Sequence, residues 1–294
     1  MPALETNFLT GAELDAATLD RLLDRAAELK AAPLAARPLE GRTVALLFQK
    51  PSTRTRTSFE TGVFELGGHP MVLRGDELQL TRGESVRDTA LVLSRHTAAI
   101  GLRTGSEDEL RELAEHATVP VFNMLSPQHH PCQALADLLT MREALGALEG
   151  RVLAYVGDGN NVARSLAVVG GLAGLEVRVA APAGYQLEEG TGALLTDDPR
   201  AAVEGADVVY TDVWVSMSDD ESTAAERRKT LAPYRIDDEL LDRAAPGAFA
   251  LHCLPAHPGE EISEAVLYGD RQRIWDQAEN RRHAQKALLE LLVG

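Results

Sequence analysis

Short apolar, β-rich runs alternate along this chain with stretches of helical periodicity, and this alternation restricts the fold more than any other sequence feature. An amphipathic first helix is expected around residues 19–29. In the first half, strands are then predicted at 43–48, 71–73, 98–103 and 119–122, with helices between them near 52–66, 86–95 and 108–117. Strands that take turns with helices are typical of a parallel sheet covered by helices.

The same rhythm restarts in the second half. A helix that opens near Ala134 continues to about Leu145, and Gly146 and Gly150 then suggest a joint. Further strands are predicted at 152–156, 177–181, 208–213 and 248–251. We therefore expect an α/β chain of two doubly wound parallel-sheet domains, residues 1–146 and 147–294, with the final helix 277–292 crossing back to the first domain.

Composition narrows the classes of protein. With 294 residues, 45% hydrophobic and 25% charged, the chain is long enough for two packed domains. The net charge of −16 argues against a nucleic-acid partner, and no apolar stretch approaches the ~20 residues that span a bilayer. The first ten residues do not resemble a secretory signal, and the two cysteines are far apart. A cytoplasmic setting is therefore expected.

The run from Pro51 to Glu60 carries the clearest indication of a ligand. Ser52 is a favourable N-cap for a helix that follows a strand, and free N–H groups at a helix N-terminus attract phosphate or carboxylate. Arg54 can add bidentate hydrogen bonds to phosphate oxygens. Arg56 lies two residues on, off that face, and is assigned a structural role. A polar helix start with solvated arginines is the alternative interpretation of these residues.

Polar residues follow several other predicted strands, where open α/β sheets gather their functional groups. These places are Arg103, Gln128–Gln133, Gly157–Asn161, Asp212–Met217 and His252–His257. His130 and Gln133 are spaced i,i+3 and can together donate to a carbonyl and accept from an amide. Taken singly, each place is more often an ordinary loop than a catalytic site.

Two other kinds of site are weakly indicated. Gly157 and Gly159 begin a dinucleotide-binding pattern, but Val162 replaces its third glycine and no acidic residue clearly ends the next strand. The histidines and cysteines at 129–132 and 252–257 could form a zinc site, but their spacings fit no standard ligand pattern. We therefore expect no metal and no cofactor.

Taken together, five segments resemble the motifs of the aspartate/ornithine carbamoyltransferase family. They are Ser-Thr-Arg-Thr-Arg at 52–56, His-Pro-Cys-Gln at 130–133, Asp-Val-Trp-Val-Ser-Met at 212–217, His-Cys-Leu-Pro at 252–255 and Gln-Ala-Glu-Asn-Arg at 277–281. The resemblance covers essentially the whole chain in order. Gly-Asp-Gly-Asn-Asn at 157–161, His-Cys-Leu-Pro and Gln79 favour the ornithine branch of the family.

This resemblance implies a carbamoyl phosphate-binding domain followed by an L-ornithine-binding domain, with L-citrulline and phosphate as products in arginine metabolism. The implied carbamoyl phosphate-binding residues are Ser52, Thr53, Arg54, Thr55, Gln79, Arg103, His130, Pro131, Cys132, Gln133, Cys253, Leu254 and Arg281. The implied ornithine-binding residues are Asn161, Asp212, Ser216 and Met217. The implied catalytic residues are Arg54, Arg103, His130, Asp212 and Cys253. A homotrimer is also implied, with Gln79 reaching a neighbouring subunit's site.

The chemistry agrees with these roles. When an amine attacks a carbamoyl carbon, negative charge grows on the carbonyl oxygen while phosphate leaves, so fixed donors at both places lower the barrier. The amine, with a pKa of about 10.4 in water, must first lose a proton. Asp212 and Cys253 are candidates to orient it, which predicts a rate that rises with pH through neutrality. A covalent Cys253 intermediate is not needed.

Three matters stay open at this stage. Between Tyr185 and Thr196 the chain has only a short link where the family usually carries a full helix, so that helix is expected to be truncated or lost. A sister transferase acting on putrescine or an acylated ornithine is one alternative function. A non-catalytic homologue that serves as a binding or scaffold subunit is the other.

Overall fold

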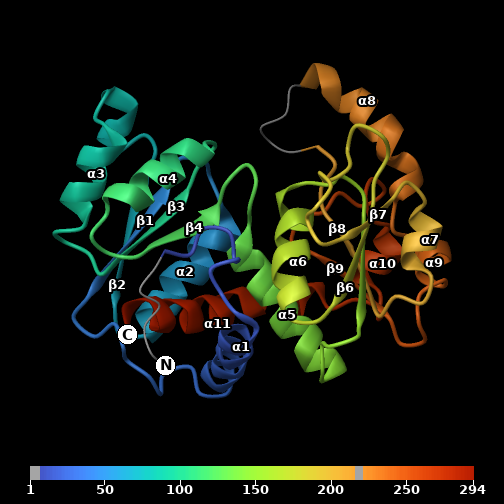
Figure 1. Cartoon of the computed structure of the whole chain (residues 1–294), viewed down its shortest axis with the longest axis horizontal. Coiled ribbons are helices and arrows are strands. Elements are labelled where there is room, and N and C mark those ends of the chain that lie inside the picture. Colours follow the sequence, from blue (N-terminus) through green and yellow to red (C-terminus); the bar gives the residue numbers. More distant parts are fainter. Residues whose placement is uncertain (1–6, 216–220) are drawn as a thin grey trace. The chain divides into compact units, whose positions relative to one another are not determined.

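The chain forms two compact α/β units, each built on a parallel sheet, as the sequence predicts. The computed structural model describes residues 7–215 and 221–294 (Figure 1). Unit 1 comprises Met1–Leu139 and Glu279–Gly294, and unit 2 comprises Thr140–Ala278. The predicted joint at residue 146 follows Leu145, the last residue of helix α5 (Pro131–Leu145). Helices α5 and α11 (Ile274–Val293) contribute residues to both units.

Unit 1 is a four-stranded parallel sheet with the order β2-β1-β3-β4. Its strands are β1 (Thr43–Phe48), β2 (His69–Arg74), β3 (Ala99–Arg103) and β4 (Val121–Leu125). Its helices are α1 (Ala16–Ala31), α2 (Thr53–Glu65), the short 3-10 helix η1 (Gln79–Arg82), α3 (Val86–Leu93), α4 (Glu107–His116), the start of α5 and most of α11.

Alternating residues of the unit 1 strands face two helical layers. Ala45, Ile100 and Val121 belong to one buried cluster with side chains of α3 and α4. The opposite face packs on α2, where Phe59 stacks on Phe122 of β4 with ring centroids 5.1 Å apart. Gly101 makes this packing possible, since a Cβ there would lie 2.4 Å from the Phe122 ring. A sheet buried on both faces explains the nearly continuous apolar runs of its strands.

The C-terminal helix α11 packs on α1 and α2 within unit 1, as its predicted return to the first domain requires (Figure 1). Arg25 of α1 makes a two-bonded pair with Glu290, at 3.0 and 3.1 Å. Lys286 is fully buried, and its Nζ donates to Glu65 of α2 at 2.6 Å and to the Leu29 carbonyl at 3.0 Å. Burial lowers the pKa of Lys286, and the bond to Glu65 opposes that change.

Unit 2 is a five-stranded parallel sheet with the order β7-β6-β5-β8-β9. Its strands are β5 (Val152–Val156), β6 (Glu176–Ala180), β7 (Leu194–Thr196), β8 (Val208–Thr211) and β9 (Phe249–His252). Its helices, besides the shared α5 and α11, are α6 (Asn161–Leu172), α7 (Pro199–Val203), α8 (Glu221–Leu231), η2 (Ala232–Tyr234), α9 (Asp238–Leu241) and α10 (Glu264–Tyr268).

In unit 2, as in unit 1, alternating strand residues face packed layers on the two sides of the sheet. Val156, Val209 and Ala250 belong to one buried cluster with side chains of α7, α9 and α10. On the other face Tyr155 of β5 stacks on Tyr210 of β8, with ring centroids 5.7 Å apart. Between β6 and β7 the described chain contains turns and no helix, which confirms the expected loss of a helix there.

Most predicted elements are confirmed, with some differences. The predicted strand at 119–122 was wrong in its limits, since β4 begins after Pro120, which lacks an N–H, and continues to Leu125. Buried Asn123 stays within this strand because its Nδ2 donates to the Leu9 carbonyl and to Ser126 Oγ. The predicted strand at 208–213 ends at Thr211. The three-residue β7 and the short helices α7, α9 and α10 were not foreseen, because each is too short for a periodic signal.

One further property concerns membranes. Across residues 7–215 and 221–294, no helix combines the length and the hydropathy that a membrane crossing requires.

We predict that the buried Lys286–Glu65 pair stabilises unit 1. Among the described residues, the Lys286→Ala change leaves Glu65 with only its pair to Arg282 at 3.3 Å and takes the donor from the Leu29 and Pro33 carbonyls, so it should lower the free energy of unfolding by about 3 kcal/mol. Arg37→Ala, at an exposed pair with Glu40, should change it by about 1 kcal/mol or less. Urea unfolding followed by circular dichroism measures both changes, and equal effects would contradict this prediction.

Candidate functional site

The polar residues of unit 1 gather where the strand order reverses. From β1 the chain passes through α2 to β2 on one side, whereas β3 lies on the other side of β1. Ser52 and Thr55 follow β1, and Arg103 is the last residue of β3. In open parallel sheets, ligands bind at the carboxyl ends of the strands at such a switch point. The topology therefore brings together segments that the sequence predicted separately.

The N-terminus of α2 has the geometry of an anion site. Ser52 is in an extended conformation and its Oγ accepts from the Thr55 N–H at 3.3 Å, which confirms it as the N-cap. Half-buried Arg54 has no hydrogen-bond or ion-pair partner among the described residues. Arg56 pairs with Glu60 at 2.9 Å, which confirms its structural role. Thr53 lies exposed on the first turn. The helix dipole and Arg54 can thus act together on an anion.

A buried chain of side chains joins α2, α5 and α11 inside unit 1. Arg281 donates through Nη2 to Thr55 Oγ1 at 2.7 Å and through Nη1 to Gln133 Oε1. Gln133 Nε2 in turn donates to Asp137 Oδ1 at 2.7 Å. Because each amide atom has a partner of the right kind, the orientation of Gln133 is fixed. Arg281 and Gln133, far apart in sequence, therefore meet beside Thr55.

His130 immediately precedes α5 and is buried. Its carbonyl accepts from the Gln133 N–H at 3.0 Å, so His130 begins the helix rather than lying in its first turn. Burial lowers the pKa of His130 well below its usual value, and the charges of Arg281 and Arg103 lower it further. A neutral imidazole can still donate one hydrogen bond to a carbonyl oxygen.

Three other predicted residues of unit 1, Pro131, Cys132 and Gln79, do not belong to this chain of side-chain hydrogen bonds. The Cys132 thiol is buried and donates to the Asn123 carbonyl at 3.2 Å, so a ligand contact from Cys132 would have to come from its main chain. Pro131 is the first residue of α5 and has no N–H to donate. Gln79 is the first residue of η1 and its side chain is exposed.

Unit 2 has a switch point of its own, between β5 and β8. The connection after β5 leads through α6 to β6 on one side, while β8 lies on the other. Asn161 begins α6, and Asp212 follows β8 directly. Gly159 is required in the turn that leads to α6, since a Cβ would lie 2.6 Å from the Tyr185 carbonyl oxygen. The glycines thus serve a tight turn, without the third glycine of a dinucleotide site.

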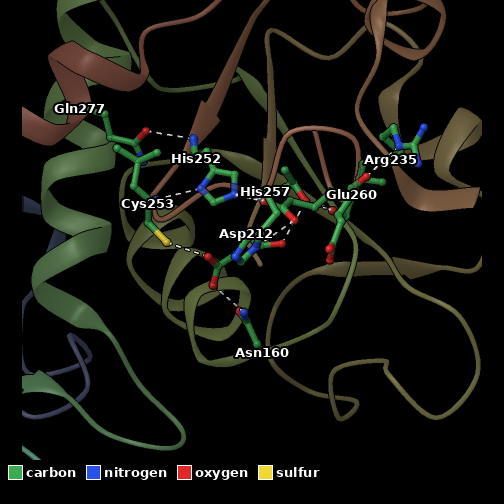
Figure 2. A network of polar contacts seen from close by, with 12 residues as sticks. Asn160, Asp212, Arg235, His252, Cys253, His257, Glu260 and Gln277 are labelled. Carbon is green, nitrogen blue, oxygen red and sulfur yellow. Dashed lines mark hydrogen bonds and ion pairs between the residues drawn. The ribbon is translucent and has the colours of Figure 1, made fainter. Parts of the chain in front are cut away.

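Cys253 and Asp212 form a hydrogen-bonded pair at this edge of the sheet (Figure 2). Cys253 Sγ donates to Asp212 Oδ1 at 2.9 Å, and Asn160 Nδ2 donates to Asp212 Oδ2 at 2.8 Å. Asp212 is largely buried, whereas Cys253 is half-buried. The arrangement offers a carboxylate and a sulfur atom together, which suits an amine better than a phosphate.

His252 fixes the main chain beside Cys253. Its Nδ1 accepts from the Leu254 N–H at 2.8 Å, so Nε2 carries the proton and donates to Glu261 Oε1 at 3.2 Å. Both side chains are fully buried. Leu254 has a φ of 61°, in the left-handed region that costs a residue with a Cβ roughly 1–2 kcal/mol. The imidazole therefore holds a strained turn directly after Cys253.

Asp212, His252 and Cys253 place one potential ligand atom each within 4.8 Å of one another, as the zinc alternative would require. The hydrogen bonds above account for this cluster, since both ring nitrogens of His252 already have partners. The expectation of no metal stays a prediction. The remaining ornithine-binding residues of the sequence-derived set, Ser216 and Met217, lie outside the described residues.

Four residues that support these clusters had no individual role in the sequence analysis. Asn160 and His252 lie within segments that the sequence singled out, whereas Asp137 and Glu261 were missed. Asn160 could have been found as the N-cap of α6, but its second contact joins loops 52 residues apart. Asp137 and Glu261 carry no local signal, because a buried carboxylate can be recognised only when its partners are known.

Comparison with known proteins agrees with this geometry. Residues 6–143 match the family model described as "Aspartate/ornithine carbamoyltransferase, carbamoyl-P binding domain", and residues 149–292 match "Aspartate/ornithine carbamoyltransferase, Asp/Orn binding domain". The chain is 55% identical to an ornithine carbamoyltransferase of Acidothermus cellulolyticus, over 98% of this chain and 96% of that protein. It is 49% identical to an anabolic ornithine carbamoyltransferase of Pyrococcus furiosus, over 88% and 86%.

The solved structures give the same result. The ornithine carbamoyltransferase from Pyrococcus furiosus superposes with a TM-score of 0.94 at 44% identity, over 100% of this chain and 99% of that one.

The neutral state of His130 predicts a pH dependence of stability. Because its pKa is lower in the folded chain than the unfolded value of about 6.5, stability is lost as the pH falls below that value. His130→Gln should remove up to about 1.4 kcal/mol per pH unit from the fall between pH 6.5 and 5. The control is exposed His69→Gln. Urea unfolding measures the slopes, and parallel slopes for wild type and His130→Gln would contradict the assignment.

The two thiols should differ in reactivity. Burial raises the pKa of Cys132 to about 12, so about one thiol in 10⁴ is ionised at pH 8. Iodoacetamide at pH 8 should modify half-buried Cys253 at least about tenfold faster than Cys132. Peptide mapping by mass spectrometry distinguishes the two, and preferential labelling of Cys132 would show that its environment is wrongly described.

Proposed function

Because the chain belongs to the aspartate/ornithine carbamoyltransferase family, we propose that it transfers the carbamoyl group of carbamoyl phosphate to the side-chain amine of L-ornithine, which gives L-citrulline and phosphate. The observation that supports this most is the Cys253–Asp212 pair at the switch point of unit 2. It offers an amine two acceptor groups in a chain whose other switch point suits an anion.

On the unit 1 side, the phosphate is held by the α2 N-terminus. The N–H groups of Thr53 and Arg54 at the first turn donate to it, the Ser52 hydroxyl adds a further contact, and the Arg54 guanidinium supplies two more donors. Arg103, at the end of the neighbouring strand, adds a second positive charge. Local donors are needed because the chain as a whole has a charge of −16 and would repel a dianion.

The carbamoyl group is polarised by a second set of donors. Neutral His130 donates to the carbonyl oxygen, and Arg281 stabilises the negative charge that develops there. Gln133 is fixed by Arg281 and Asp137 and addresses the carbamoyl nitrogen. As the C–O bond to phosphate breaks, Arg54 and Arg103 stabilise the leaving dianion. Because the amine attacks directly, no covalent intermediate with the protein forms.

The ornithine amine is oriented by Asp212 and Cys253. In solution the amine has a pKa of about 10.4, so the reactive neutral form is scarce at pH 7 and the step is favoured by higher pH. The carboxylate and the sulfur accept its N–H groups and direct the lone pair toward the carbonyl carbon. The Cys253 and Leu254 main chain, held by His252, completes the contacts to the carbamoyl group. Asn161, Ser216 and Met217 bind the amino-acid end.

The physiological setting follows from the family. We place the enzyme in the cytoplasm, in the arginine-biosynthetic direction, consistent with the anabolic Pyrococcus furiosus relative and with two cysteines that form no disulfide bond. Its assembly is a homotrimer in which exposed Gln79 of one subunit reaches the carbamoyl phosphate of the next.

Product formation with a panel of amines tests this function. Carbamoyl phosphate with L-ornithine should give citrulline, whereas putrescine, N-acetylornithine and L-aspartate should give little product, because the amino-acid end is needed for binding. The rate should rise from pH 6 to 9. Turnover of another amine in place of ornithine would show that ornithine is not the acceptor. A flat pH profile would contradict the deprotonation step.

Arg54 provides the mutational test. Arg54→Ala should lower kcat/KM for carbamoyl phosphate on the order of 100-fold, because bidentate charged hydrogen bonds are lost. Arg56→Ala, two residues away and paired with Glu60, is the matched control and should stay within about twofold. Similar losses in both variants would indicate damage to the helix rather than loss of a phosphate contact.

A further inference from the structure

We propose that Asn160 is a positioning residue that sets the orientation of the Asp212 carboxylate through its side-chain amide. This inference rests on the proposed function, since Asp212 acts there on the attacking amine. Asn160 belongs to none of the residue sets that the sequence motifs single out as binding or catalytic. Its role depends on contacts to β5 and α6 and on the contact with Asp212 in the loop after β8, which Figure 2 shows, and all of them lie within unit 2.

The amide oxygen of Asn160 is fixed by three donors. As the N-cap of α6, its Oδ1 accepts from the N–H groups of Val162 at 2.9 Å and Ala163 at 3.2 Å. The hydroxyl of Tyr155 lies 3.2 Å from the same oxygen. Burial raises the pKa of Tyr155 well above its usual value, so the phenol keeps its proton and donates it. The amide cannot turn over without losing all three bonds.

The amide nitrogen is consequently directed at Asp212. Asn160 Nδ2 donates to Asp212 Oδ2 at 2.8 Å, and Cys253 Sγ donates to Asp212 Oδ1 at 2.9 Å. Each carboxylate oxygen thus has its own donor, and the two bonds together fix the plane of the carboxylate. Of the two, the bond from Asn160 is tied to the rigid helix start, whereas the thiol is itself a group that meets the substrate. Asn160 therefore holds the Asp212 carboxylate in a fixed position relative to the start of α6.

A cap alone would not need this geometry. Ser or Asp caps a helix as well as Asn does, because capping uses only an acceptor. Asn160 uses two separate atoms, with Oδ1 at the cap and Nδ2 on the Asp212 carboxylate, whereas Asp has no donor when ionised and the single hydroxyl of the shorter Ser side chain cannot stay at the cap and also reach Asp212. The two roles of Asn160, as helix cap and as donor to Asp212, can therefore be separated by substitutions that keep the cap acceptor and remove the donor.

Asn160→Asp and Asn160→Ser are these substitutions. Asn160→Ser should keep the urea midpoint of unfolding close to that of the wild type, because the cap acceptor remains, whereas Asn160→Asp should lower the midpoint at pH 8 because its carboxylate faces that of Asp212. Both should lower kcat with ornithine at least tenfold at pH 8, per folded molecule, and leave KM for carbamoyl phosphate within twofold. Ser263→Asp, which adds the same charge at the N-cap of α10, is the matched control and should leave kcat unchanged.

The pH dependence distinguishes positioning from a general structural effect. In Asn160→Asp, a proton shared by the two carboxylates restores a donor to Asp212, so the ratio of wild-type to variant kcat should shrink several-fold between pH 8 and 6. In Asn160→Ser the ratio should not depend on pH. The titratable and charged groups near this pair include Tyr155, Asp158 with its partner Arg227, His252 and Cys253, and all are unchanged in both variants.

Alkylation of Cys253 gives a readout that needs no turnover. The added carboxylate in Asn160→Asp should slow iodoacetamide labelling of Cys253 at pH 8 at least threefold, because it disfavours the thiolate beside Asp212. If the wild-type chain makes no citrulline but Asn160→Asp still labels more slowly than the wild type, the proposed function is refuted and the contact between Asn160 and Asp212 is supported. Variants with wild-type kcat per folded molecule and unchanged labelling would show that Asn160 is a helix cap only.

Discussion

All strands of both sheets run parallel to their neighbours, and the positions of the polar residues follow from that single constraint. Parallel strands end at one edge of the sheet, and a doubly wound order creates one place where two successive loops leave in opposite directions. In unit 1 this place holds the start of α2 and Arg103, and in unit 2 it holds Asn160 and Asp212. The central strands β1, β3, β5 and β8 are largely buried, so accessible chemistry is confined to the strand ends and the loops that follow them.

Hydrogen bonds to side-chain amides then fix the reactive groups. Gln133 is held between Arg281 and Asp137, Asn160 between the α6 start and Asp212, and Gln277 between the His252 N–H and the Tyr210 hydroxyl. An amide has a donor side and an acceptor side, so it can join a carboxylate to a main chain without bringing a charge into a buried place. Such groups cost no reorganisation when charge develops in the reaction.

Sequence analysis predicted the sheet rhythm, the Ser52 cap and the strand ends because each rests on a local pattern. The pairs Arg281–Gln133 and Asp212–Cys253 needed the family resemblance, since they join residues 148 and 41 positions apart. The contact of Asn160 with Asp212 and that of Glu261 with His252 could be recognised only in the structure, because the partners come from other elements. The short strand β7 was missed because its local signal is weak, since three residues carry too little periodicity.

The most direct measurement is a crystal structure of the chain with a non-hydrolysable phosphonate analogue of carbamoyl phosphate. The account predicts phosphonate oxygens within hydrogen-bond distance of the Thr53 and Arg54 main-chain N–H groups and the Arg54 guanidinium. It also predicts the analogue's carbonyl oxygen near His130. A phosphonate bound instead at the start of α6, beside Asn161, would contradict the assignment of the two switch points.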